Sequence, residues 1–294
     1  MLVECVPNFS EGRNQEIISG LADILSSQEG CRLLDYSADP DHNRSVFTLA
    51  GESEDVAHVL FDAVAYALKN IDMAQHYGIH PRIGAVDVIP FIPLEDTTEE
   101  DCIGLAKKFG KRLGEELKIP VYLYEKAATG KHRENLANVR KGEFEGLTEK
   151  MKNKDWVPDF GPLKPHPTFG AVAVGVRPFL IAFNINLSTQ DVTVAKKIAH
   201  TIRFSSGGLP AVKALGIFLK KEGVAQVTIN LTDYRVTPLW QVFDLVCREA
   251  ERYGVAILES ELIGLIPQDA IIGCGAHYLK FKNFQTDRIL EKRL

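Results

Sequence analysis

Apolar residues along the first third of the chain recur in an order that predicts a βαββαβ unit. Short apolar runs indicate strands at 2–7, 31–37, 45–51 and 85–92. Apolar residues at helical spacing indicate helices at 14–27 and 53–71. A further helix is predicted at 98–118, followed by a strand at 120–125.

The same order of elements recurs in the second half of the chain. Strands are predicted at 179–187, 212–220, 225–233 and 255–266, with helices at 191–203 and 238–254. The repeat predicts an α+β fold built from two ferredoxin-like subdomains, in a duplicated αβ sandwich. We expect the N-terminal subdomain to cover residues 1–178 and the C-terminal one 179–294.

Two strands of the second half alternate strictly between apolar and uncharged polar residues. Asn184 and Asn186 alternate with Ile185, and Thr228 and Asn230 follow the same pattern. A solvated outer face of an antiparallel sheet explains this pattern. A polar cleft between the two halves explains it as well, and also accounts for amides in place of Lys and Glu.

The segment 155–170, DWVPDFGPLKPHPTFG, is rich in proline and aromatic residues and fits neither a helix nor a strand. One interpretation is a linker between domains. The other is a shaped loop whose aromatic rings stack on a flat ligand at low entropic cost.

Composition and charge exclude several classes of protein. A net charge of −5 gives no field for nucleic acid, so we expect a small-molecule partner held by local Lys and Arg residues. The five cysteines are scattered and contain no CxxC pair, which is typical of reduced thiols. No signal-peptide pattern or membrane-spanning run is present, which predicts a cytoplasmic protein without a membrane anchor.

His80 stands out among the eight histidines because its backbone is constrained on both sides. Gly78 frees the preceding turn, and Pro81 keeps His80 out of the helical region. An imidazole aimed in this way suits general acid–base catalysis, although a turn histidine that caps a strand fits the same residues. His76 and His80 have the i, i+4 spacing of a helical metal site, but Gly78 and Pro81 interrupt a helix, so we expect no metal.

Two other polar clusters follow strand ends. The turn 38–44 contains Asp39, Asp41, His42, Asn43 and Arg44, residue types that serve chemistry and turn formation equally well. The segment 7–14 is ambiguous in the same way, because its polar residues cap the first helix or contact a ligand beyond a strand end. These residues are Asn8, Ser10, Glu11 and Asn14.

Five blocks of sequence, in this order, resemble the formiminotransferase family over nearly the whole chain. They are VECVPNFSEGRN, HPRIGAVDVIPFIP, PVYLYEKA, WVPDFGP and FLIAFNINL. The resemblance implies transfer of a formimino group from N-formimino-L-glutamate to N5 of tetrahydrofolate, a co-substrate, in a tunnel between the subdomains and without a metal. It also implies a form that lacks the cyclodeaminase domain carried by many members.

The resemblance also implies the site residues. The family's catalytic histidine falls on His80. Animal members carry a catalytic aspartate where this chain has Ser37, so Asp39 is expected to replace it, with Asp35 as the second choice. The folate-binding stretch falls on Gly161, Pro162, Leu163, Lys164, Pro165, His166, Pro167, Thr168, Phe169 and Gly170.

Substrate carboxylates are expected to pair with Arg44 and Arg82, and Asn8, Ser10 and Asn184 are further candidates for substrate binding. A homodimer and a separate cyclodeaminase chain are the expected protein partners. Two alternatives stay open: a folate enzyme that handles 5-formyl groups, and a ferredoxin-like RNA-binding module, which the acidic charge disfavours.

Overall fold

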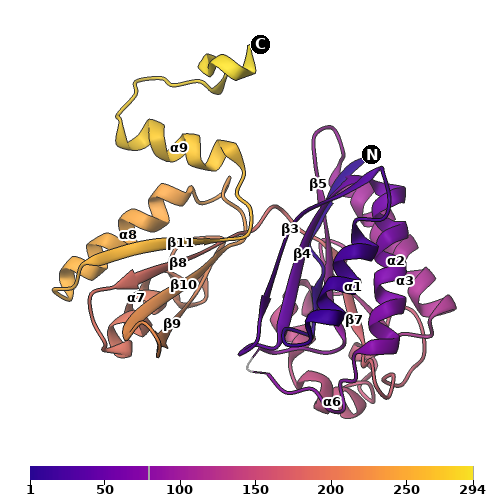
Figure 1. The fold of residues 1–294 in the computed structure, drawn as a ribbon. Coiled ribbons are helices and arrows are strands. Elements are labelled where there is room, and N and C mark those ends of the chain that lie inside the picture. Colours follow the sequence, from indigo (N-terminus) through magenta and orange to yellow (C-terminus); the bar gives the residue numbers. More distant parts are fainter. Residues whose placement is uncertain (79, 294) are drawn as a thin grey trace. The chain divides into compact units, whose positions relative to one another are not determined.

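The strands in the N-terminal part of the chain form one sheet, and three helices cover one of its faces. A computed structural model describes residues 1–78 and 80–293 and divides into two compact units, Met1–Arg177 (unit 1) and Pro178–Leu294 (unit 2) (Figure 1). The elements of unit 1 are β1 Leu2–Cys5, β2 Asn8–Phe9, α1 Gln15–Leu25, β3 Cys31–Asp39, β4 Arg44–Glu52, α2 Ser53–Asn70, β5 Val86–Pro93, α3 Glu99–Glu116, β6 Val121–Glu125, α4 Lys131–Glu134, α5 Leu136–Arg140, α6 Glu143–Lys150, the short 3-10 helix η1 Lys154–Trp156 and β7 Val172–Val176.

Local signals in the sequence start and orient these helices. The Asn14 side chain accepts hydrogen bonds from the backbone amides of Glu16 and Ile17 and so caps α1. Thr98 and Asp101 form a capping box at the start of α3. In α1 the residues Ile18, Leu21 and Leu25 share one face and are buried, so this face packs on the sheet.

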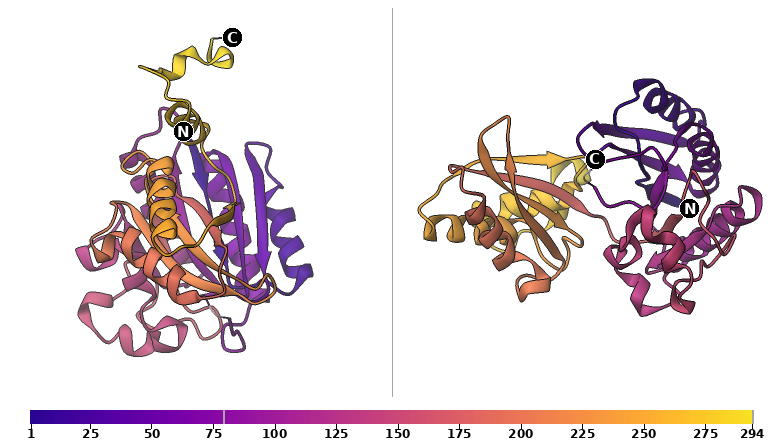
Figure 2. Two further views of the ribbon diagram at one scale, coloured as in Figure 1. Left: turned by 90° about the vertical axis from the view of Figure 1, so that its left-hand side faces the viewer. Right: turned by 90° about the horizontal axis from the view of Figure 1, so that it is seen from below.

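The sheet of unit 1 has the order β3-β4-β1/β2-β5-β7-β6, because β1 and β2 both lie between β4 and β5. Pairings from β3 to β5 are antiparallel, whereas β7 pairs in parallel with both β5 and β6. Helices α1, α2 and α3 cover one face of this sheet, as Figures 1 and 2 show. A smaller core lies around Tyr122 and Tyr124, whose neighbours include residues of α5 and α6.

Strand β7 was not predicted from the sequence. Its residues Val172–Val176 are all buried, and a strand buried on both faces lacks the polar alternation that marks a half-exposed one. The helices α4 to α6 were not predicted either, since each is short and carries no long apolar repeat.

Unit 2 repeats the βαββαβ order of elements in a smaller sheet. Its elements are β8 Ile181–Leu187, α7 Val192–Ile202, η2 Phe204–Ser206, β9 Val212–Leu219, β10 Val224–Leu231, α8 Leu239–Arg252, β11 Ile257–Ile263, α9 Gln268–Tyr278, η3 Thr286–Arg288 and η4 Leu290–Lys292. The strands pair in antiparallel fashion in the order β11-β8-β10-β9. Helices α7 and α8 bury the apolar face of this sheet, which includes Phe183, Ile185 and Val227.

The fold is thus a mixed α+β structure with two αβ units, as the sequence predicts. Within residues 1–78 and 80–293, no helix combines the length and the apolar character that crossing a membrane requires.

Candidate functional site

Two residues predicted for substrate binding, Asn8 and Arg44, lie on the face of the unit 1 sheet opposite α1, α2 and α3. Phe9, Phe47 and Val86 belong to the main core, and successive strand residues point to opposite faces. Asn8, Arg44 and Asp87 therefore point away from that core.

Arg44 connects these residues to His80. Its Nη1 lies 2.6 Å from His80 Nδ1 and donates to Asp87 Oδ2 at 3.2 Å. Its Nε donates to Asn8 Oδ1 at 2.9 Å, and its Nη2 donates to the same oxygen. His80 Nδ1 also lies 2.8 Å from the carbonyl oxygen of Pro81. The structure thus brings three of the predicted site residues, Asn8, Arg44 and His80, into one hydrogen-bonded group.

Asp87 and Arg140 complete this group and were missed by sequence reasoning. Asp87 is buried, and its Oδ2 accepts from Arg140 Nε at 2.9 Å and from Arg140 Nη2 at 2.5 Å. Its Oδ1 accepts from the backbone amide of Ile83 at 3.0 Å. A single acidic residue inside the apolar run AVDVIPFIP was the available signal, because a buried carboxylate requires a partner.

The charges of this group shift several pKa values. Burial raises the pKa of Asp87, but Arg140 and Arg44 outweigh it and hold the carboxyl ionised. Burial, only partly offset by Asp87, lowers the pKa of Arg44 to about 10, so it remains charged at neutral pH. Burial and then the positive charges of Arg44 and Arg140 lower the pKa of His80 to about 3. His80 is therefore neutral at pH 7. Its pKa lies well below the ordinary histidine value that its sequence setting suggested.

The predicted acidic partner, Asp39, contacts His42 at the end of the β3–β4 hairpin. Its Oδ1 accepts from the backbone amides of Asp41 and His42 at 2.8 and 2.9 Å, and its Oδ2 lies 2.7 Å from His42 Nδ1. The rings of His42 and His80 are neighbours, with centroids 6.3 Å apart. The imidazole of His42 thus lies between the Asp39 carboxylate, which it contacts, and the ring of His80, which is its neighbour.

Ser10 and Arg82 stabilise the loop that carries His80. The Ser10 hydroxyl is buried and donates to the carbonyl oxygen of Gly84 at 2.7 Å. Arg82 is also buried and donates to Glu143 and Glu145, with N–O distances of 2.6 Å to each carboxylate. Its role as a carboxylate ligand for substrate stays a prediction, and it would require these ion pairs to open.

The predicted folate-binding stretch, 161–170, adjoins the same loop at its C-terminal end. The backbone amide of Ala85 donates to the carbonyl oxygen of Phe169 at 2.8 Å, and the backbone amide of Met73 donates to the carbonyl oxygen of Thr168 at 2.7 Å. Gly170 has a φ of +83°, a conformation that favours glycine, and a Cβ at this position would lie only 2.3 Å from the carbonyl oxygen of Ile83. Phe169 is buried in the main core, whereas Leu163 is 71% exposed. One end of the stretch is therefore anchored while its first part is accessible.

Asn184 lies in unit 2, on the sheet face opposite α7 and α8. Its amide donates to Glu261 at 3.2 Å, and Asn186 donates to Glu259 at 2.9 Å and accepts from Gln226 at 2.9 Å. The amides that alternate along β8 therefore face acidic side chains of β11, which the sequence pattern alone did not indicate.

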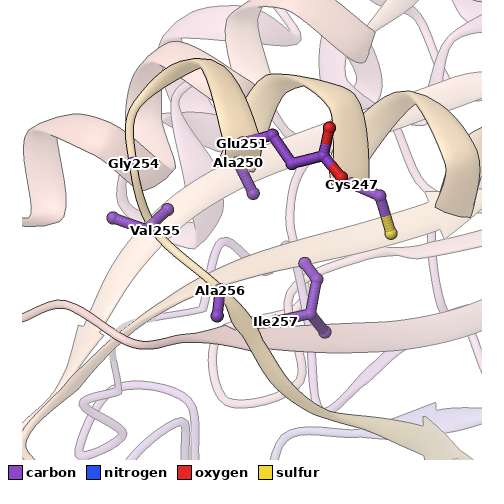
Figure 3. A pocket seen from close by; sticks show the side chains of 7 residues that line it. All are labelled: Cys247, Ala250, Glu251, Gly254, Val255, Ala256 and Ile257. Carbon is purple, nitrogen blue, oxygen red and sulfur yellow. The ribbon is translucent and has the colours of Figure 1, made fainter.

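A surface hollow of about 450 Å³ lies elsewhere in unit 2, where the end of α8 leads into β11 (Figure 3). Cys247, Glu251 and Ile257 are among its lining residues, and it contains none of the predicted site residues. Across residues 1–78 and 80–293, no group of three or more His, Cys, Asp or Glu side chains is arranged to hold a metal ion.

Comparison with known proteins accounts for both units. Residues 2–177 match the family model described as "Formiminotransferase domain, N-terminal subdomain", and residues 182–292 match "Formiminotransferase domain". The chain is 47% identical over its full length to a glutamate formimidoyltransferase of Streptococcus pyogenes, of which it covers 98%, and 46% identical to one of Thermoplasma acidophilum, of which it covers 97%. It is also 45% identical to the formimidoyltransferase-cyclodeaminase of Sus scrofa over 96% of this chain and 53% of that protein. With both units matched and nearly half of all residues shared with full-length relatives, this chain belongs to the formiminotransferase family.

Proposed function

We propose that this chain is a glutamate formimidoyltransferase, which transfers the formimino group of N-formimino-L-glutamate to N5 of tetrahydrofolate. The observation that carries the proposal is the full-length identity of 46–47% to two proteins of that name. Tetrahydrofolate is a co-substrate in this reaction, and the subdomains are proposed to divide at residues 178 and 179.

The reaction moves one proton as well as the formimino group. The lone pair of N5 attacks the formimino carbon, a C–N bond forms, and N5 becomes cationic. That proton must leave N5, and the glutamate nitrogen must gain one before its C–N bond breaks. The products are 5-formimino-tetrahydrofolate and glutamate.

His80 is the proposed acid–base residue, and its neutral form at pH 7 supports this role because a base must be unprotonated to act. In the structure, Arg44 donates to Nδ1, and since a guanidinium only donates, the proton of the neutral ring then lies on Nε2. If Arg44 turns to a substrate carboxylate, Nδ1–H is free to donate to the Pro81 carbonyl oxygen at 2.8 Å. The Nε2 lone pair then becomes available to accept the N5 proton.

Substrate anions would strengthen this base. Both substrates carry glutamate carboxylates, and a carboxylate paired with Arg44 offsets one of the charges that lower the pKa of His80. We propose Asn8, Ser10, Arg82 and Asn184 as further substrate contacts and residues 161–170 as the folate-binding stretch. A cytoplasmic location, a homodimer and a separate cyclodeaminase partner are also proposed.

A folate enzyme that acts on 5-formyl groups is the second candidate, since formyl and formimino groups differ only by O against NH. The test is to supply the purified chain with N-formimino-L-glutamate or N-formyl-L-glutamate and to follow glutamate and ammonia separately. Tetrahydrofolate-dependent release of glutamate from the formimino donor is expected. Release without tetrahydrofolate would indicate a hydrolase and contradict the proposal, and a preference for the formyl donor would favour the second candidate.

A further inference from the structure

A second imidazole, that of His42, lies beside His80 and shares its surroundings. The ring centroids are 6.3 Å apart, and the planes meet at 62°. Because a hydrogen bond spans about 2.6–3.2 Å from each ring nitrogen, rings at this separation can both reach substituents of one carbon placed between them.

The chain around His42 holds this arrangement in place. Asn43 donates to the carbonyl oxygen of Tyr77 at 3.1 Å, and His76 Nε2 lies 3.0 Å from the carbonyl oxygen of Asn43. A Cβ on Gly78 would lie only 2.3 Å from the His42 carbonyl oxygen, so the two loops approach as closely as glycine allows. His42 is therefore held on a packed hairpin end, although its side chain is 43% exposed.

Asp39 accepts hydrogen bonds from both the backbone amide and the ring of His42. Burial opposes ionisation of Asp39, but hydrogen bonds from the backbone amide and the ring of His42 lower its pKa. An ionised carboxylate only accepts, so the 2.7 Å contact places a hydrogen on His42 Nδ1 and compensates the charge of an imidazolium.

The two imidazoles thus have opposite electrostatic surroundings. An imidazolium at His80 would face Arg44 at 2.6 Å, whereas one at His42 faces Asp39 at 2.7 Å. Other charged or titratable groups around the hairpin end include Asp41 in the turn, Glu11 and Arg13 on either side of Gly12, and His76 and Tyr77 in the facing loop. Arg13 Nε donates to the Pro40 carbonyl oxygen. Paired groups whose environments favour opposite protonation states are typical of an acid and a base that work together.

We propose that His42, held by Asp39, is the general acid of the transfer, while His80 is the base. His80 takes the proton from N5 as the new C–N bond forms. The imidazolium of His42 then donates its proton to the glutamate nitrogen, and the electron pair of the breaking C–N bond leaves with that nitrogen. His80 finally passes its proton to His42, so one proton has moved from N5 to glutamate and both residues are restored. The assignment rests on the proposed function.

The test compares the His42→Gln variant with wild type and with a matched control. His58 and Asp62 on α2 form another exposed histidine–aspartate pair, 3.6 Å apart, so His58→Gln serves as the control. Glutamate release is measured at saturating tetrahydrofolate across pH. We expect His42→Gln to lower kcat by about 10²-fold with little change in KM and to remove the alkaline limb of the pH profile, because a general acid acts only while protonated. Imidazole in solution should partly rescue His42→Ala.

Asp39→Asn gives a second, independent readout. The amide introduced by this substitution keeps an oxygen for the two backbone amides but directs NH2 at His42 Nδ1, which inverts the tautomer and removes the compensating charge. We expect Asp39→Asn to lower kcat, and the double variant with His42→Gln to be no worse than His42→Gln alone. A His42→Gln variant with the kcat and pH profile of His58→Gln would overturn the role of His42. Wild-type inactivity with both donors would instead overturn the proposed function and this role with it.

Discussion

The imidazole of His80 is half-buried, in contact with the Arg44 guanidinium and within the electrostatic influence of Arg140, and this environment decides which proton-transfer role it can have. A base must be neutral before it acts, and the imidazolium that it becomes must then release its proton. A pKa lowered to about 3 keeps His80 neutral and favours release of the proton. A substrate anion paired with Arg44 raises this pKa again and so strengthens the base. The constraint from Gly78 and Pro81 is visible in the sequence, whereas the neighbouring charges come from β4 and α5.

We expect His80→Ala to lower kcat by about 10²-fold or more while the affinity for tetrahydrofolate stays nearly unchanged. The loss lies in proton transfer rather than in ground-state contacts. Steady-state kinetics and a fluorescence titration with tetrahydrofolate separate the two effects. Unchanged turnover would mean that His80 only shapes the turn.

The stability of the protein should depend on pH through His80. Its pKa is lower in the folded chain than the value of about 6.5 in the unfolded chain. Between about pH 6.5 and pH 3 the unfolded chain binds more protons, so the free energy of unfolding decreases as the pH falls. Urea denaturation at several pH values should show wild type losing stability relative to His80→Gln over this window. Parallel curves would contradict the lowered pKa.

Asp87→Asn tests the buried carboxylate that faces Arg44 and Arg140. Removing its charge leaves two guanidinium groups poorly compensated, and we expect a loss of about 3–5 kcal/mol in the free energy of unfolding. Because the pKa of Asp87 is lowered in the fold, this stabilisation is present above the unfolded pKa and is lost as acid protonates the native carboxyl. The difference between wild type and variant should therefore shrink below about pH 4. Asp62→Asn, at an exposed position, should change stability by less than about 0.5 kcal/mol.

At the scale of elements, the site depends on two loops that pack against each other, the β3–β4 hairpin end and the loop formed by residues 72–78 and 80–82. The Asn43 side chain, which donates to the Tyr77 carbonyl oxygen, and the close approach of Gly78 to the His42 carbonyl oxygen hold the two loops together. The loop position of His80 was predictable from Gly78 and Pro81. The partner loop was not, because pairing between distant loops leaves no periodic pattern in the sequence.

Gly78→Ala should push these loops apart. Its Cβ would meet the His42 carbonyl oxygen at 2.3 Å, so the backbone must shift, with a cost of about 1–3 kcal/mol and a reduced kcat. Gly104→Ala is the control, since a Cβ there meets nothing within 4 Å and alanine favours the helix α3. Thermal denaturation and kinetics of both variants decide the matter. A Gly78→Ala enzyme as stable and active as wild type would show that the loops need no close contact.

At the scale of the whole molecule, each unit has its own hydrophobic core. The buried clusters of unit 1 contain only residues up to Val176, and that of unit 2 begins at Ile181. A unit with its own core can fold by itself.

We therefore expect fragments 1–177 and 178–294 to unfold cooperatively when expressed separately, as circular dichroism during thermal denaturation would show. Neither fragment should transfer the formimino group, because the predicted site residues His80 and Asn184 lie in different units. Transfer by fragment 1–177 alone would show that unit 2 contributes nothing essential. A fragment without a cooperative transition would show that its core depends on the other unit.

The sequence by itself determined the βαββαβ order in both units, though not β7 or α4 to α6, because hydrophobic periodicity and capping residues act over a few neighbouring positions. It also determined which loops carry His80 and residues 161–170, since glycine and proline constrain the backbone locally. Only the tertiary structure decided that Arg44 donates to His80, that Asp87 joins Arg44 to Arg140, and that Asp39 acts on His42. Most of these contacts join residues from separate elements, and a charge pair buried between such elements depends on how the backbone brings them together in space rather than on spacing along the chain.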